Sequence, residues 1–221
     1  MKRVIIICEG QTEQEFCNDV LVPYFSRHGI FLDNPKIKKT NGGITNWRAL
    51  KRQIELHLLE EQNAYVTTLI DYYGLYANHG FPSWVEAEQR TDRNERMDIL
   101  ERGMENDIRE DLRKRFKAYI QLHEFEGILF SDISVFDRGF EKQEFADYAY
   151  LESTIREHSN PEMINNQRET APSKRLTKIV KGYDKVVHGS LLAHDIGLVK
   201  IREKCPRFDN WILQIEKYHN P

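Results

Sequence analysis

Cysteine is scarce in this sequence, and the three cysteines lie far apart. Cys8, Cys17 and Cys205 form neither a disulfide framework nor a Cys-x-x-Cys metal motif. The apolar run near the N-terminus is followed at once by Glu9, so it lacks the small-residue cleavage site of a secretory signal. We therefore expect a protein of the reducing cytoplasm.

Long apolar runs are absent too, and so are the glycine-rich motifs that bind nucleotides. No stretch approaches the roughly 20 apolar residues that a membrane-spanning helix needs, so we expect no membrane partner. Asp71-x-x-Gly74 resembles the magnesium switch of P-loop NTPases, but the Gly-Lys-Ser/Thr loop of those proteins does not occur. Gly10 lacks the partner glycines of a dinucleotide fingerprint. Both nucleotide-binding classes are excluded.

Hydrophobic residues and charges are plentiful, and both are informative. The chain has 221 residues, of which 40% are hydrophobic and 11% aromatic, enough to build a packed core. No Gly/Ser-rich linker or internal repeat divides it, which favours one compact unit. The net charge of −3 combines an acidic first part with a basic segment after Asn165. This asymmetry fits a cation-using site beside an anion-binding surface, although uneven charge also arises without function.

Strand and helix patterns alternate in the first part of the chain. That alternation predicts an α/β sandwich around a mainly parallel sheet. The rest of the chain is mostly helical, so we expect a core over residues 1–132 and a helical part over 133–221 that packs on the same unit. The expected strands are Arg3–Cys8, Lys36–Thr40, Tyr65–Ile70 and Lys117–His123, and the expected helices are Glu13–Arg27, Asn46–Glu61, Asn94–Lys114, Glu144–His158, Ser173–Lys181 and two between Ile196 and Tyr218, broken at Pro206.

Acidic residues follow three of the predicted strands. Glu9 follows the first strand, Asp71 follows the third, and Glu124 and Glu126 follow the fourth. The carboxyl ends of parallel strands meet along one edge of the sheet, which is where open α/β proteins bind ligands. Glu13 lies in the first turn of the helix after Glu9. We therefore expect these carboxylates to lie close together.

A cluster of carboxylates at one edge needs a compensating cation. Like charges raise one another's pKa unless a cation neutralises them, and Mg²⁺ (or Mn²⁺) is bound by carboxylates, waters and phosphate oxygens. Such a metal polarises a phosphodiester and activates water, which suits its hydrolysis. Glu9, Asp71 and Glu126 are then the expected catalytic residues, and the same three with Glu13 the metal ligands. The alternative is that each acid caps a helix or pairs with a nearby lysine.

A helix begins soon after the Glu9-Gly10 turn. Thr12 is a suitable N-cap, and Glu15 stands three residues later as its capping-box partner. The N-terminus of this helix is therefore expected next to the first carboxylate of the cluster.

Cations gather at helical spacing in the segment that begins at Pro172. Ser173 at the expected helix start could bind a phosphate through free backbone N–H groups. We expect Lys174, Arg175 and Lys185 to contact the phosphates of a nucleic acid. The alternative is an ordinary solvated helix face.

These motifs resemble those of a known fold family. A strand ending in Glu9-Gly10, a later strand ending at Asp71 and a third acidic strand end are similar to the TOPRIM fold of topoisomerases, primases and overcoming-lysogenization-defect nucleases. The resemblance is closer still to DUF4276, a bacterial family grouped with TOPRIM-like proteins, and it covers nearly the whole chain. The matching segments are Glu9-Gly10-Gln11-Thr12-Glu13, Asp71-Tyr72-Tyr73-Gly74-Leu75, His123-Glu124-Phe125-Glu126, Pro172-Ser173-Lys174-Arg175-Leu176 and Tyr183-Asp184-Lys185.

The resemblance implies a fold, an activity and a partner. The fold is TOPRIM-like (Rossmann-like), and the activity is that of a Mg²⁺-dependent nuclease or nuclease subunit acting on nucleic-acid phosphodiesters. In TOPRIM proteins the glutamate is a general acid/base or metal ligand, and a later Asp-x-Asp holds Mg²⁺. DUF4276 members often look like partners of ABC/SMC-like ATPases in phage-defence gene pairs, so such an ATPase is the implied partner. Whether the chain forms a homodimer stays open.

One position departs from the TOPRIM pattern. Where Asp-x-Asp is expected the chain has Asp71-Tyr72-Tyr73, so a tyrosine replaces the second aspartate. Glu126 could substitute in space for the lost ligand. The loss equally favours a non-catalytic TOPRIM-like subunit that docks on the ATPase and senses a nucleic acid or phage product. A third alternative is a phosphotransferase or phosphatase acting on a small nucleotide.

Overall fold

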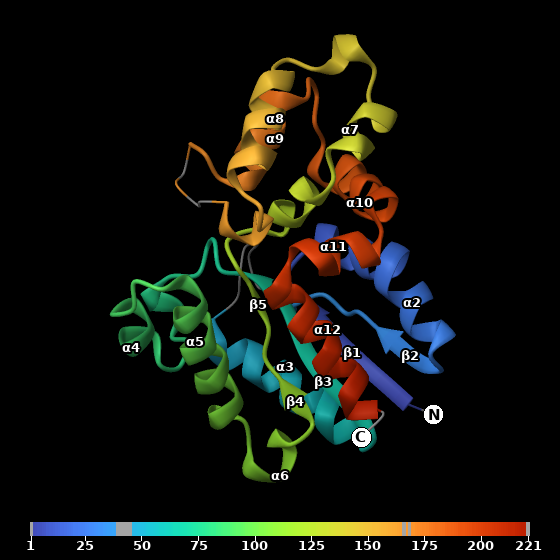
Figure 1. Cartoon of the computed structure of the whole chain (residues 1–221). Coiled ribbons are helices and arrows are strands. Elements are labelled where there is room, and N and C mark those ends of the chain that lie inside the picture. Colours follow the sequence, from blue (N-terminus) through green and yellow to red (C-terminus); the bar gives the residue numbers. More distant parts are fainter. Residues whose placement is uncertain (1, 39–45, 165–166, 168, 220–221) are drawn as a thin grey trace.

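A parallel sheet lies between two layers of helices, and a helical lobe extends from it in the computed structural model of the chain (Figure 1). The structure describes residues 2–38, 46–164, 167 and 169–219. The expected α/β architecture, with a mainly parallel sheet flanked by helices and a helical C-terminal region, is confirmed. None of the helices in the described ranges is long and apolar enough to cross a membrane.

All strand pairs of the sheet are parallel, and the strand order is β2-β1-β3-β4, with β5 also pairing with β3. Both central strands are therefore flanked on each side, and every residue of β3 is buried. Thr68 fills the gap between β4 and β5, because its hydroxyl bonds both the N–H and the C=O of Tyr119, at 2.9 Å each. The strands are β1 (Lys2–Cys8), β2 (Ile30–Asp33), β3 (Ala64–Asp71), β4 (Phe116–Lys117) and β5 (Ile120–Gln121).

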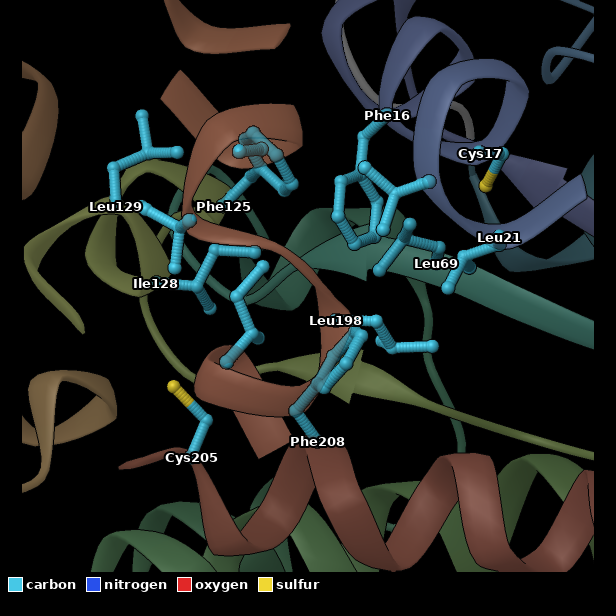
Figure 2. Close-up of a cluster of buried hydrophobic side chains, with 14 of the residues drawn as sticks. Phe16, Cys17, Leu21, Leu69, Phe125, Ile128, Leu129, Leu198, Cys205 and Phe208 are labelled. Atoms are coloured by element: carbon cyan, nitrogen blue, oxygen red, sulfur yellow. The ribbon is translucent and has the colours of Figure 1, made fainter. Parts of the chain in front are cut away.

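Side chains of the central strands alternate between two hydrophobic cores, one on each face of the sheet. Val4, Ile6 and Cys8 of β1 belong to the first core, whereas Ile5 and Ile7 belong to the second. The first core is shared by the early helices, the lobe and the C-terminal helices, and Figure 2 shows part of it. One continuous core therefore joins residues before and after position 132.

The helices divide between these cores and the lobe. The first core is covered by α1 (Gln11–Phe16), a π-helical turn (Cys17–Leu21), α2 (Val22–Arg27), α10 (Lys185–Ile196), α11 (Leu198–Lys204) and α12 (Pro206–His219). The second is covered by α3 (Trp47–Glu60), α4 (Trp84–Glu88), α5 (Arg93–Asp107) and α6 (Glu110–Arg113). The lobe contains α7 (Ile133–Gly139), α8 (Tyr148–Glu157) and α9 (Pro172–Ile179), and short 3-10 turns lie at Ala77–His79, Phe125–Ser131, Lys142–Glu144 and Pro161–Met163.

The second strand differs from its prediction. It is β2 at Ile30–Asp33, directly after the left-handed Gly29, and not at Lys36–Thr40. Of the predicted segment, Lys36 forms an isolated bridge with Cys8, and residues 39 and 40 lie outside the described residues. The sequence pattern does not predict a strand at 30–33, because a four-residue edge strand shows little periodicity.

Edge strand β4 is covered on its open side by helix α5. The N–H of Ala118 donates to a carboxylate oxygen of Glu105 at 3.2 Å, and the N–H of Ile120 donates to one of Glu101 at 2.8 Å. These side chains take the bonds that another strand would otherwise form, which protects the sheet edge from pairing with another chain.

Candidate functional site

The strand ends bring Glu9 and Asp71 together, as the sequence predicts. β1 and β3 are neighbours in register, and the N–H of Glu9 extends the ladder by donating to the C=O of Leu69 at 3.0 Å. Glu9 Oε2 accepts a hydrogen bond from the N–H of Asp71 at 2.9 Å. The carboxylate of Glu9 therefore lies across the end of β3 and is oriented by it.

Asp71 is a buried carboxyl group with acidic neighbours. Its Oδ1 accepts from the N–H of Phe125 at 2.9 Å, which ties it to the third acidic strand end. Burial raises the pKa of Asp71 well above its usual value, and the charges of Glu13 and Glu9 raise it further. The group is therefore held in a site with an excess of negative charge.

Glu13 joins this cluster because the first helix begins earlier than expected. The N-cap of α1 is Gly10, and Glu13 Oε2 accepts from the N–H of Gly10 at 2.8 Å. Thr12 is thus wrong as the N-cap, and Glu15 as the capping partner. The helix starts directly at the strand end, because the extended backbone at Gly10 already makes the turn. Glu13 therefore caps the helix and also acts on Asp71.

Glu126 and Lys185 form an ion pair beside these acids. Lys185 Nζ lies 2.9 Å from Glu126 Oε1, and the Glu126 side chain is fully buried whereas that of Lys185 is 43% exposed. Burial raises the pKa of Glu126 to about 7, although the lysine opposes that shift. Glu126 Oε2 has no hydrogen-bond partner among the described residues.

Lys185 is the cation of the cluster. It is the first residue of α10, whose N-cap Asp184 accepts from the N–H groups of Val186 and Val187. The negative charges of Glu126 and Asp71 raise the pKa of Lys185, although burial opposes them. This lysine therefore stays charged and faces the acids.

The three cations predicted to bind phosphates do not lie together in the structure. Lys174 is exposed on α9, whereas Arg175 is 7% exposed and donates to Thr154 and Thr170 within the lobe. Lys185 lies with the acids. The structure thus gives the three cations different surroundings.

The N-terminus of α9 is engaged by a carboxylate from the protein itself. Glu124 accepts from the N–H of Ser173 at 2.9 Å and from its hydroxyl at 3.1 Å. The backbone donor that the sequence would offer to a phosphate is therefore occupied. Glu124 serves the helix cap and connects the lobe to the site.

The residues fit a hard divalent cation in chemistry but do not converge on one point. The charges of three other acids and of one lysine act on Asp71, so Lys185 neutralises only part of the charge of the cluster. Oxygen donors are the ligands that Mg²⁺ prefers. Within the described ranges, however, no three Asp, Glu, His or Cys side chains are placed to hold one ion. Binding would therefore need side-chain movement, with Lys185 the obvious group to move, because it is partly exposed.

One family model matches the chain over residues 8–216, and its description is a domain of unknown function, DUF4276. The chain belongs to the DUF4276 family. No curated protein and no solved structure matches it. Every residue of the acid cluster, from Glu9 to Lys185, lies within the DUF4276 match.

The DUF4276 fold also shows which features of the site the sequence did not reveal. The helix that carries Lys185 was not predicted, although Asp184 followed by an apolar stretch is a recognisable N-cap signal. Tyr73 is half-buried and donates its N–H to the C=O of His123 at 2.8 Å. Its backbone therefore continues the pairing of β3 beyond Asp71.

His123 lies at the same edge in a strained conformation. Its φ of 69° is in the left-handed region, which a residue with a Cβ rarely adopts. Arg93 Nη1 donates to its Nε2 at 2.9 Å, so the neutral ring carries its proton on Nδ1. Burial and Arg93 lower the pKa of His123 to about 3. This histidine is therefore neutral and buried at the same edge of the sheet as the acid cluster.

Proposed function

We propose that this protein is a metal-dependent phosphodiester hydrolase that acts on nucleic acid, with its site at the carboxyl ends of β1 and β3. The observation that carries the proposal is that Glu9, Glu13, Glu126 and Lys185 all lie close enough to Asp71 for their charges to act on its carboxyl group. Four acids with one cation leave an excess of negative charge, which a divalent ion would compensate. The TOPRIM-like relationship of this edge is part of the same proposal.

The residues present suggest separate roles. Glu9 and Asp71, with Glu126, would hold Mg²⁺ or Mn²⁺, which would supply a polarised phosphate and an activated water. Lys185, released from part of its pairing when a cation arrives, would bind a phosphate oxygen and stabilise charge in the transition state. As a metal ligand Glu126 would be deprotonated, because the cation favours the charged form of the carboxyl group.

A second candidate function follows from the ion pair between Lys185 and Glu126. A lysine that neutralises the acids in place of a metal favours a non-catalytic subunit that binds a partner or nucleic acid through the same edge. The replacement of an aspartate by Tyr73 points the same way. An ABC/SMC-like ATPase in phage defence is the partner that the family resemblance suggests for either function.

A cleavage assay tests the proposed hydrolase. Purified protein with Mg²⁺ or Mn²⁺ is expected to cut DNA or RNA, and Glu9→Gln is expected to reduce the rate at least about 100-fold. The fold should survive, because the amide oxygen of glutamine can still accept from the N–H of Asp71. The matched control is Glu15→Gln, which changes an acid on the following helix α1, outside the cluster, and should retain the wild-type rate.

Two results would overturn this proposal. One is a wild-type protein that cuts neither DNA nor RNA with either metal, which would favour the non-catalytic subunit. The other is a Glu9→Gln variant that cuts as fast as the wild type.

A further inference from the structure

A concave surface lies in the helical lobe, away from the acid cluster. A pocket of about 520 Å³ is lined by residues between the end of α7 and the start of α8. These two helices lie in the upper part of Figure 1. Its lining is mainly aromatic, with one carboxylate and one lysine at its margin. The lining residues are Asp137, Phe140, Lys142, Phe145 and Tyr148.

The rings of this pocket are held in place at steep angles to each other. Phe140 and Phe145 meet at 70° with centroids 5.9 Å apart, and Phe145 and Tyr148 meet at 84° with centroids 5.0 Å apart. The hydroxyl of Tyr148 donates to Asp137 Oδ1 at 2.7 Å. The backbone of Phe145 forms an antiparallel bridge with Val180. The pocket is therefore built before any ligand binds.

Aromatic rings connect this pocket to the acid cluster. Phe140 contacts His188 with centroids 5.5 Å apart, and His188 stacks on Tyr183 at 5.7 Å and 29°. His188 is fixed because its Nδ1 accepts from the N–H of Asp184 at 2.7 Å. Both His188 and Lys185 belong to the first turns of α10, and the charge of Glu126 adds to the effect of burial in raising the pKa of Tyr183, so the series of rings begins near Glu126.

We propose that this pocket binds an unstacked base of a single-stranded nucleic acid whose phosphates reach the acid cluster. The inference rests on the proposed function, because it names the strand as the substrate. Aromatic rings stack on bases of any identity, and a strand outside a duplex presents its bases for stacking. Lys142 can pair with a phosphate, and Asp137 can accept from an exocyclic amino group.

Oligonucleotide binding without hydrolysis tests the pocket. The affinity of a labelled single-stranded oligonucleotide is measured by fluorescence anisotropy with Ca²⁺ in place of Mg²⁺, so that a divalent cation still offsets the acids. Phe145→Leu keeps the apolar character but removes the ring, so the affinity should fall about 5- to 150-fold. Phe145→Tyr keeps the ring and should bind like the wild type. Val199→Ala, at a side chain 73% exposed on α11, is the control that should change nothing.

The outcomes separate this proposal from the proposed function. Equal affinity of wild type and Phe145→Leu would overturn the base pocket. Equal affinity of the wild type for an abasic strand of the same length would also overturn it. Hydrolysis of bis(4-nitrophenyl) phosphate reports on the acid cluster alone, so Phe145→Leu should retain it. If binding depends on the Phe145 ring but no variant hydrolyses the diester, the base-pocket proposal is supported and the proposed hydrolase function is overturned.

Discussion

At the scale of single residues, each acid of the cluster serves both the fold and the site. The carboxylate of Glu9 accepts from the N–H of Asp71 at the end of β3, and Glu13 caps α1 by accepting from the N–H of Gly10. Asp71 is held by the N–H of Phe125. Backbone donors thus fix one oxygen of each of these three carboxylates, whereas Glu126 is paired with Lys185. A site built in this way is positioned before a ligand arrives.

Glu126 is the residue at which function and stability should oppose each other. Burial without full compensation raises the pKa of its carboxyl group to about 7, so the charged form is costly at pH 8. Glu126→Gln should raise the free energy of unfolding at pH 8 by about 1–3 kcal/mol and abolish hydrolysis. In this variant the ammonium group of Lys185 loses its ion pair, but water can solvate it because the side chain is partly exposed. Urea denaturation at pH 8 measures the change.

Glu124→Gln provides the comparison for this variant. That acid caps α9 through Ser173, so its neutralisation should lower stability instead of raising it. A Glu126→Gln protein less stable than the wild type at pH 8 would contradict the account of its burial.

At the scale of elements, the sequence predicted the central strands and the starts of α3 and α12 best. Asn46 accepts from the N–H of Ala49 as the N-cap of α3, and α12 begins at Pro206, where the break was expected. Both signals are local and depend on a few neighbouring residues. The predicted helix Asn94–Lys114 instead ends at Asp107 and resumes as α6, because the backbone at Ile108 is extended. That apolar side chain packs in the core, which periodicity alone cannot foresee.

Contacts between distant segments were the part that the sequence could not supply. The three strand ends were expected to meet, because parallel strands align their carboxyl ends. Nothing local indicated that Lys185 would return from the C-terminal part to Glu126, or that Glu124 would occupy the N-terminus of α9. Both contacts depend on how the lobe sits on the sheet.

Glu101 of α5, which accepts a hydrogen bond from the sheet edge, is expected to titrate near neutral pH. Burial raises the pKa of Glu101 to about 7, although the guanidinium of Arg207 opposes the shift. The unfolded carboxyl group loses its proton near pH 4.5, whereas the folded one keeps it until about pH 7, so this group lowers stability as the pH rises between these values. Glu101→Gln should reduce the fall in unfolding free energy between pH 5 and pH 8 by about 2–3 kcal/mol.

Chemical denaturation at the two pH values tests the role of Glu101. Glutamine can still accept from the N–H of Ile120, and Arg207 retains Asp98 at 2.6 Å, so the edge should stay covered. Identical pH dependence in variant and wild type would show that Glu101 does not titrate in this window.

At the scale of the whole molecule, the C-terminal helices and the sheet should unfold together. Trp211 of α12 is 2% exposed, donates to Thr67 of β3 at 2.9 Å and stacks on Tyr119 at 4.5 Å. Trp211→Ala should therefore cost about 3–5 kcal/mol of unfolding free energy while the transition stays single. Circular dichroism during urea denaturation measures both.

Trp84→Ala is the matched control for this substitution. Trp84 lies on α4 and is only half-buried, so its loss should cost less than that of Trp211. Two separate transitions in the wild type would contradict a single unit and would favour independent folding of the helical part.

The most direct test of the central claim is a calorimetric titration of Mn²⁺ into the purified protein, because it needs neither substrate nor partner. The wild type should bind the ion, and Asp71→Asn should weaken binding at least about tenfold while the amide oxygen still accepts from the N–H of Phe125. Lys185→Met should bind more tightly, since it removes the ammonium group that competes for the same acids. A wild type that binds no Mn²⁺, or an Asp71→Asn isotherm identical to it, would contradict the metal site.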